Sequence, residues 1–403
     1  MRLLLFLVVC SSCSVRNWST GSSLVASERE VALSLGEPDP GESGFDLRAL
    51  PQLPAPQHVR PCCAFGVDLG VTVDGKPVPG YRVENIKAVS DLGQHEYDKG
   101  ALSLNEDLSR FATSENNGLV YTCRGGFIDT AHVRDYADLT LFLTMTLVRQ
   151  LERGGTFELP GDGATRVITL APVPPELIAR HGRWTVAITL AQWTAFRLSL
   201  WHEVVTWYGL ESVKGFSEKA SAFSPEDLYS NALGIRLAGG ILSKGVVRSR
   251  SDWDRQVDAW LKQAFLRLKD LPEKTGRAVM KQLDGRWWDS SRTLPDFRLV
   301  KRRNFATTFP LKAWRLEDTG LPLDVAVANL CRDEAALPLE VPEVLGAVPA
   351  ASLVSVRFDL GAWAPKGFPT AESRSVTADA LPQLIEEVHR AARVELGEGF
   401  DSP

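Results

Sequence analysis

Long hydrophobic runs are missing from this 403-residue sequence beyond its first few residues. No later segment approaches the roughly 20 uninterrupted apolar residues that a membrane-spanning helix needs. Long runs of basic residues are missing too, and 45 Lys and Arg against 50 Asp and Glu give a formal net charge of −5, which argues against a nucleic-acid partner. There is no internal repeat, which excludes a solenoid or a propeller. What remains is 44% apolar and 24% charged, the composition of an ordinary globular protein with enough material for a sizeable core.

The N-terminus has the pattern of an export signal. A basic start, Met1-Arg2, is followed by a short apolar run and then by small residues that end at Cys13. This resembles bacterial lipoprotein signals and predicts a signal peptide over residues 1–13, with Cys13 as the lipidated residue and Cys10 as the alternative. We expect an exported protein, periplasmic or anchored to the outer membrane through an N-terminal lipid, or secreted if it is cleaved without lipidation.

Composition divides the rest of the chain into three parts. Residues 14–55 are rich in Ser, Gly, Glu and Pro, which predicts a flexible tether. Residues 56–305 are predicted to form the main helical domain, and residues 306–403 a C-terminal extension with a strand and an amphipathic helix.

Cysteine is scarce in the predicted mature protein, where only Cys62, Cys63, Cys123 and Cys331 remain. In an oxidising compartment we expect Cys123 to form a disulfide with Cys62 or Cys63, because adjacent cysteines cannot easily bond to each other. The alternative is that Cys123 acts as a nucleophile assisted by His132, which requires a reduced and exposed thiol.

Hydrophobic periodicity predicts several helices and few strands. The predicted helices cover residues 129–152, 175–181, 190–208, 225–242, 253–271 and 381–396, and the predicted strands include a pair within 157–171 and a single strand at 352–360. Ser224 is the expected N-cap of the fourth of these helices. The fold class is therefore α+β, with a predominantly α-helical core of several packed helices, a small antiparallel sheet and a C-terminal α/β appendage.

One polar motif lies at the start of the first long helix. Asp129, His132 and Asp135 recur every three residues, a spacing that lets a carboxylate orient an imidazole for metal binding or for base catalysis. The structural alternative is an acidic first helical turn that suits the helix dipole, with Arg134 and Asp138 forming a pair one turn apart.

A second motif places His202 and Glu203 inside an otherwise apolar helix. A two-histidine zinc helix needs a second histidine four residues later, where this chain has Thr206, so a metal would need further ligands from elsewhere, such as His132 or nearby acids. Burying this pair is costly unless it is paired, either within a structural network or at a functional site.

A third polar stretch connects two predicted helices and carries hydroxyl, amide and carboxylate groups. Ser217, Glu218, Tyr229 and Asn231 are candidates to line a pocket with the His-Glu pair.

Four segments together resemble the bacterial domain of unknown function 4056 family. They are Pro61-Cys-Cys, the stretch from Tyr121 to Arg134, the His-Glu helix ending in Thr-Trp-Tyr-Gly, and Phe216 to Asn231. The resemblance covers about residues 61–305. It implies an exported or lipoprotein-like envelope protein and no established activity.

Two functions follow as hypotheses. The first is a metal-dependent or general-base hydrolase of the cell envelope, with His132 and His202 as metal ligands or bases, Glu203 activating water, and Asp129 or Glu218 completing the site. The cofactor would be zinc or another divalent metal. The second is a non-catalytic envelope binding or assembly module in which the same residues form a buried structural network. Both hypotheses predict that His132, His202 and Glu203 converge, and an open cleft at that point favours the enzyme.

Overall fold

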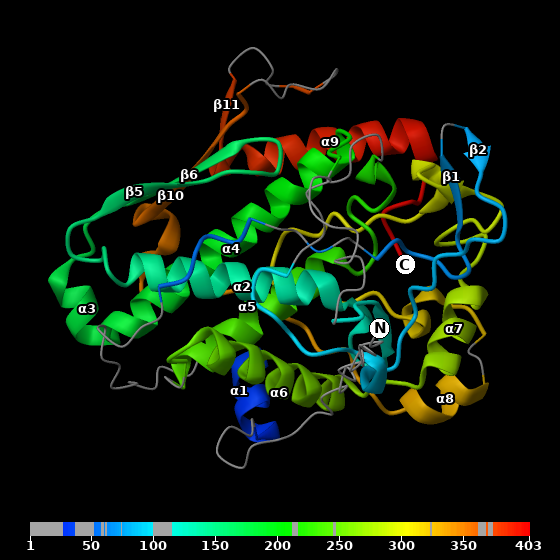
Figure 1. The fold of residues 1–403 in the computed structure, drawn as a ribbon, viewed down its shortest axis with the longest axis horizontal. Helices are drawn as coiled ribbons and strands as arrows, with labels where there is room; N and C mark the ends of the chain where they lie inside the picture. Colours follow the sequence, from blue (N-terminus) through cyan, green and yellow to red (C-terminus); the bar gives the residue numbers. More distant parts are fainter. Residues whose placement is uncertain are drawn as a thin grey trace, which may run out of the picture.

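The computed structural model (Figure 1) describes residues 27–36, 52–57, 60, 63–73, 75–99, 115–211, 217–244, 247–322, 325–361, 368–369 and 374–403. The predicted signal peptide with Cys10 and Cys13, most of the predicted tether, and Cys62 lie outside these residues. No helix within the described ranges is long and apolar enough to cross a membrane.

Three helices form the centre of the fold. These are α2 (Thr130–Leu147), α4 (Arg183–Trp207) and α5 (Asp227–Ser243), and each packs against the other two. α4 is buried along nearly its whole length, as expected for a helix that is apolar on all sides. α2 and α5 approach most closely at Gly234, where a Cβ atom would lie 2.1 Å from the carbonyl oxygen of Val133. Only glycine allows this contact.

Most predicted helices are present with shifted ends. α3 (Pro175–His181) and α9 (Leu381–Leu396) match their predicted ranges, and α6 (Arg250–Leu268) begins three residues earlier than predicted. The prediction for Ser224 is wrong, because α5 begins only at Asp227. The Ser224 hydroxyl instead donates to the carbonyl oxygen of Ser221 (2.7 Å), and the Ser224 N–H donates to the Asp227 carboxylate (2.6 Å). A turn therefore occupies the position where the helix was expected to start.

A four-stranded antiparallel sheet covers one side of the helices, in the order β11-β10-β6-β5. Its strands are β5 (Gly155–Leu159), β6 (Thr165–Leu170), β10 (Val354–Asp359) and β11 (Ser375–Thr377). The predicted C-terminal strand thus pairs with the predicted hairpin instead of forming a layer of its own, because alternate residues of β10 add to the main core: Phe358 stacks on Trp201 of α4 (centroids 4.2 Å apart). Figure 1 shows α9 lying alongside α4 at the same side of the molecule. The α+β class is confirmed.

The opposite side of the core carries α6 and a short helix, α1 (Glu28–Gly36), as Figure 1 shows. Val31 and Leu35 of α1 are fully buried against the helices α5 and α6. The expectation of a flexible tether over residues 14–55 therefore does not hold for this segment. Its apolar residues are spaced so that one helical face meets the core.

A second, smaller hydrophobic core lies beyond the ends of the central helices α2, α4 and α5, at the right of Figure 1. It includes two helices, α7 (Glu273–Gln282) and α8 (Val325–Cys331), and the strands β1 (Gly70–Val73), β3 (Leu119–Thr122), β4 (Gly126–Asp129) and β7 (Thr293–Leu294). The exposed strand β2 (Lys76–Pro77) pairs with β1. The remaining strands, β8 (Val344–Leu345) and β9 (Val348–Pro349), form a separate hairpin. Short 3-10 turns occur at 89–91, 218–220, 297–299, 316–319, 350–352 and 378–380.

The predicted disulfide is wrong in its partner. Cys123 is bonded to Cys331, 208 residues away, with their Cα atoms 5.1 Å apart. Cys63 is a free thiol. The C-terminal end of α8 packs beside the β3–β4 hairpin and brings Cys331 to Cys123, whereas the Cys63 N–H donates a hydrogen bond to the Asp129 carboxylate (2.9 Å).

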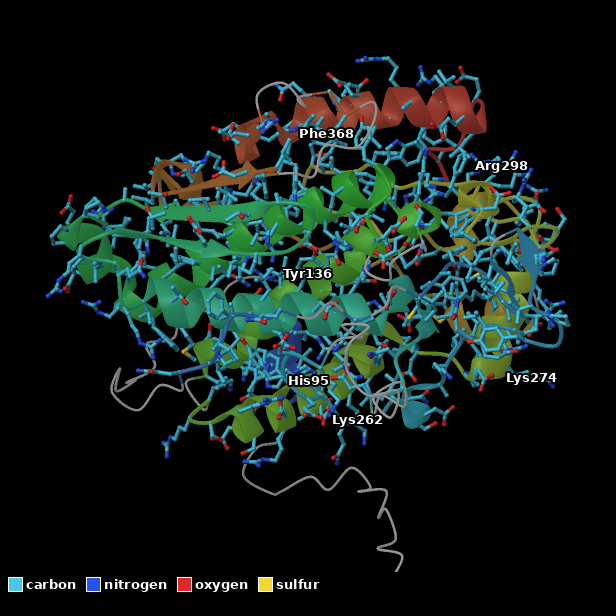
Figure 2. All side chains as sticks on the ribbon, turned by 45° about the horizontal axis from the view of Figure 1, so that its top comes forward. His95, Tyr136, Lys262, Lys274, Arg298 and Phe368 are labelled. Carbon is cyan, nitrogen blue, oxygen red and sulfur yellow. A yellow bond between two sulfur atoms is a disulfide. The ribbon has the colours of Figure 1, made fainter. Side chains whose placement is uncertain are left out.

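Side chains follow the expected division between core and surface. Figure 2 shows Tyr136 inside the helical layer, while Lys262, Lys274 and Arg298 are exposed at the outside. The described part of the chain also buries several charged groups, and most of these belong to two clusters on different sides of α2.

Candidate metal centre

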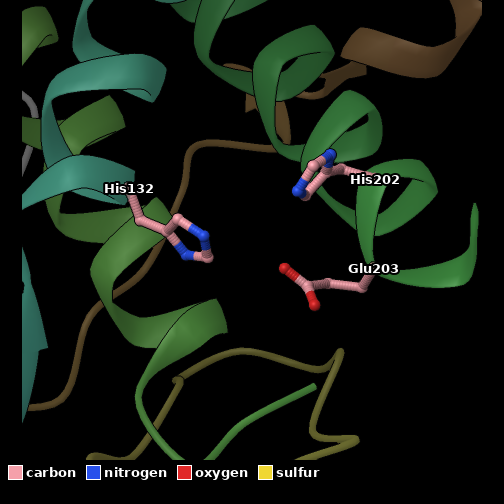
Figure 3. Close-up of side chains that lie close together, drawn as sticks. All are labelled: His132, His202 and Glu203. Atoms are coloured by element: carbon pink, nitrogen blue, oxygen red, sulfur yellow. The ribbon is translucent and has the colours of Figure 1, made fainter. Parts of the chain in front are cut away.

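The first cluster contains the three residues that were predicted to converge. α2 carries His132, and the neighbouring α4 carries His202 and Glu203. One potential ligand atom from each residue lies within 4.8 Å of those of the other two. Figure 3 shows the two imidazoles and the carboxylate pointing toward a common point between the helices. The predicted convergence is confirmed, and all three residues are at most 3% exposed.

Asp129 holds the helical turn that carries His132. Its Oδ1 accepts hydrogen bonds from the N–H groups of Ala131 (2.7 Å) and His132 (3.4 Å), and its Oδ2 accepts one from the Cys63 N–H (2.9 Å). Asp129 is therefore the N-cap of α2. Burial raises the pKa of Asp129 to about 6, although these hydrogen bonds oppose the shift.

Each imidazole has a second carboxylate beside its Nδ1 atom. His202 Nδ1 hydrogen-bonds Asp162 Oδ1 (3.3 Å), and His132 Nδ1 lies 3.4 Å from Asp227 Oδ1. This leaves the Nε2 atom of each ring as the nitrogen for a metal, and such carboxylate partners orient metal-binding histidines in other proteins. Sequence reasoning missed both carboxylates. Asp162 comes from the Gly-Asp-Gly turn between β5 and β6, and Asp227 is the first residue of α5.

Asp135, predicted to act with His132, faces the other side of α2. Its carboxylate binds Arg60 (2.7 Å), which also binds Glu115 and Asp138. Asp135 therefore belongs to the second buried cluster. A helix has 3.6 residues per turn, so residues three positions apart are rotated relative to each other about the helix axis. A three-residue repeat therefore does not keep all of its members on one face.

Glu203 has one oxygen engaged and one available. Its Oε2 accepts a hydrogen bond from the Phe223 N–H (2.7 Å), whereas its Oε1 is buried and has no hydrogen-bond partner among the described residues. The Thr206 hydroxyl, one turn later, is also buried and has no hydrogen bond within the described ranges. The second histidine of the site is His132 of α2, because α4 carries Thr206 at the position where a zinc helix has its second histidine.

Among the described residues, acidic side chains outnumber basic ones around His132, His202 and Glu203. Both carboxylate oxygens of Glu226 are buried and lack a hydrogen-bond partner in the part of the chain that the structure describes. Burial raises the pKa of Glu226 well above its usual value, and the charges of Asp129 and Glu203 raise it further. The pKa of Asp227 is also raised, by burial and by Glu203 and Glu226.

Arg303 is a buried base whose charge acts on this group. Burial lowers the pKa of Arg303 to about 10, against the opposing charges of the three acids Glu203, Glu226 and Asp227. Arg303 and His202 do not balance the charge of all the surrounding acids, because the pKa values of Glu226 and Asp227 remain raised, so these acids favour an additional cation, either a proton or a metal ion.

The two histidines differ in protonation. Burial lowers the pKa of His132 to about 4, so this imidazole is neutral at pH 7 and suited to bind a metal. Burial also lowers the pKa of His202, but the hydrogen bond and charge of Asp162, with Glu203 and Glu218, outweigh it and raise the value to about 9. A metal at this site must therefore displace a proton from His202.

The third sequence motif is only partly placed at the site. Glu218 is half-buried at the start of a 3-10 turn and acts on His202 through its charge. The Ser217 hydroxyl accepts a hydrogen bond from the Lys219 N–H (3.3 Å), and the Tyr229 hydroxyl donates to the Leu337 carbonyl oxygen (2.7 Å), so neither is directed at the histidines. Asn231 is buried, and its amide has no partner among the described side chains and backbone.

The alternative of a thiol nucleophile is excluded. Cys123 is completely buried and bonded to Cys331, so it offers no thiolate.

The family described as protein of unknown function (DUF4056) matches residues 50–312, about two thirds of the chain. The chain belongs to this family. No curated protein and no solved structure matches it. All of the candidate site (His132, His202, Glu203 and their partners Asp162 and Asp227) lies inside the part that matches DUF4056, whereas Cys331, β10 and α9 lie beyond it. The family match therefore assigns no reaction to the site.

Proposed function

We propose that this DUF4056 protein is a metal-dependent hydrolase of the cell envelope with a single divalent metal, zinc in the first instance. The observation that carries the proposal is the convergence of His132, His202 and Glu203, with Asp162 hydrogen-bonded to Nδ1 of His202 and Asp227 lying 3.4 Å from Nδ1 of His132. The donor set fits the metal. Two imidazole nitrogens and one carboxylate oxygen are the ligands of many catalytic zinc sites.

His132, His202 and Glu203 would hold the metal, which would act as a Lewis acid and lower the pKa of a water molecule toward 7. Glu203 contributes to the site through Oε1, because Oε2 is engaged by the Phe223 N–H. The role of general base then passes from Glu203 to Glu226, which has two unpartnered oxygens in the described structure and a raised pKa. A carboxylate whose pKa is raised holds a proton more strongly than an ordinary carboxylate and is therefore a stronger base.

The cellular part of the proposal rests on the N-terminal sequence. An export signal with lipidation at Cys13, or at Cys10, would anchor the enzyme to a membrane and give it access to envelope substrates.

A second function is favoured by one observation, the nearly complete burial of all three candidate ligands. In this alternative, the same residues form a hydrogen-bonded network that fixes the packing of α2, α4 and α5 in a non-catalytic envelope module.

Metal analysis separates the two functions. We expect about one equivalent of zinc or another divalent metal in the purified full chain, and loss of this metal in His202→Ala. His389→Ala is the matched control, because His389 lies on α9, far along the chain, and pairs with Asp401 (2.8 Å). Asp162→Asn should weaken metal affinity about 10- to 100-fold, as changes in such orienting carboxylates do elsewhere.

Activity provides the next test. Glu226→Gln should retain the metal and lose hydrolysis of ester or peptide substrates in a screen. No metal in the wild type, together with a marked loss of stability in His202→Ala, would contradict the hydrolase and support the structural network.

A further inference from the structure

A cavity of about 360 Å³ lies on the side of α5 that faces α1, α4 and α6, away from the metal centre. Its walls include Thr189 and Gln192 of α4, Arg236 of α5 and Trp260 of α6. Arg236 is nine residues after Asp227 on the same helix, a separation of about 13 Å along the axis. The cavity and the metal centre are therefore different sites.

Arg236 is the unusual residue of this cavity. It is only 2% exposed, and no described residue forms a hydrogen bond or an ion pair with its guanidinium group. Burial lowers the pKa of Arg236 to about 10, with only a partly opposing effect from Glu340, so the group still carries its charge at pH 7. A buried charge without a partner is costly.

The other fully buried arginines behave differently. Arg60 binds three carboxylates, Arg134 donates to Asn117 and to backbone carbonyl oxygens, and Arg303 donates to the carbonyl oxygens of Ala222 and Phe297. Arg236 thus differs from them in facing a cavity instead of a protein partner.

The helices are held at close distance around this cavity. A Cβ atom at Gly239 would lie 2.1 Å from Gln192 Nε2, and one at Gly240 would lie 2.5 Å from both Ser34 of α1 and the Trp260 ring. α1 covers the cavity, and an ion pair between Glu30 and Lys244 joins it to the end of α5.

The lining also has the composition of a ligand site. The charged residues are Arg29, Arg236 and Lys244 against Glu30 alone, so the cavity is positive in a protein whose net charge is negative. Trp260 and Ile188 supply apolar surface, while Thr189 and Gln192 supply polar groups. Mostly preformed pockets of 300–1,000 Å³ with a few converging polar groups are typical of small-molecule sites.

We propose that this cavity binds a small organic anion whose carboxylate or phosphate group pairs with Arg236 and whose body lies against Trp260. A guanidinium group in a dry site binds both oxyanions in a bidentate manner. α1 covers the bound molecule, so occupancy of the cavity and docking of α1 stabilise each other. This proposal is independent of the metal centre.

The test compares oxyanions at constant ionic strength. The full chain is melted in chloride, in inorganic phosphate and in acetate, and binding of the same ions is measured by titration calorimetry. We expect a saturable rise of the melting temperature with at least one oxyanion over chloride. A response to phosphate alone indicates a phosphate ester as the natural ligand, and a response to acetate alone indicates a carboxylate.

Three variants make the test specific. Arg236→Met should weaken oxyanion binding about 10- to 100-fold while melting in chloride no lower than the wild type, because it removes an unpaired buried charge. Thr185→Trp, at the half-buried rim, should block the cavity without touching Arg236. Arg197→Met is the control, since Arg197 binds Glu343 (2.8 Å) and does not line the cavity.

The proposal is overturned if neither oxyanion stabilises the wild type beyond chloride, or if Arg236→Met and Thr185→Trp respond as the wild type does. If Arg236→Met fails to fold, Thr185→Trp decides the question alone.

Discussion

His95 provides a sharp test of the second buried cluster, on the side of α2 opposite the metal centre. Its side chain is fully buried, with Nε2 2.9 Å from Asp138 Oδ1 and Nδ1 3.3 Å from Glu115 Oε1. Burial lowers the pKa of His95, but the charge and hydrogen bond of Asp138, together with Glu115, outweigh it and raise the value to about 9 despite the nearby Arg60.

The raised pKa means that protonated His95 stabilises the folded state. The ordinary value is 6.5, and the difference corresponds to about 3 kcal/mol at 1.36 kcal/mol per pH unit. For a group whose pKa is higher in the folded than in the unfolded protein, this contribution is fully present below pH 6.5 and is lost as the pH rises toward 9. Stability should therefore fall over this window.

Other groups of the cluster titrate as well. Burial raises the pKa of Asp135 to about 7 and those of Asp254 and Asp258 to about 6, which also lowers stability as the pH rises. The quantity to measure is therefore the difference between the wild type and His95→Gln, in which these acids remain.

The assay is urea unfolding of the full chain with the disulfide intact at pH 6, 7.5 and 9. We expect the free energy of unfolding of the wild type to fall by about 3 kcal/mol more than that of His95→Gln between pH 6 and pH 9. Parallel pH profiles of the two proteins would show that His95 is not protonated in the fold and would refute the reasoning.

Three further changes test the packing. Cys331→Ser should lower the free energy of unfolding by about 2–5 kcal/mol in urea titrations under oxidising conditions, whereas Cys63→Ser, at the free thiol, should change it far less; equal losses would contradict the observed pairing. Gly234→Ala should cost about 1–3 kcal/mol in the same assay, because the new methyl group meets the Val133 carbonyl oxygen, and an unchanged midpoint would argue against the close α2–α5 contact. Leu35→Ala should cost about 2–5 kcal/mol if α1 is docked, and almost nothing if this segment is a tether.

Much of the local structure could be predicted from the sequence. The range of α9 and the β5–β6 hairpin follow from hydrophobic periodicity and a Gly-Asp-Gly turn, which depend on neighbouring residues only. The convergence of His132, His202 and Glu203 could also be predicted, because polar side chains in apolar helices need partners when those helices pack.

Helix starts were less predictable. Ser224 is a residue type that favours the N-cap position, and it is followed by a proline, as expected at the start of a helix. Its hydroxyl instead donates to the Ser221 carbonyl oxygen in the turn before α5. Local preference for a cap is worth about 1 kcal/mol, which tertiary packing readily overrides.

The sequence by itself determined the fold class, the main helices and the three residues at the centre of the candidate site, since these depend on periodicity and on the cost of burying polar groups. Only the tertiary structure decided that Asp162 and Asp227 lie beside the two histidines, that Cys123 bonds to Cys331, and that Arg236 lines a cavity. Each of these arrangements brings together segments that are distant in the chain. Their proximity depends on how whole helices and strands pack, and no spacing between neighbouring residues records it.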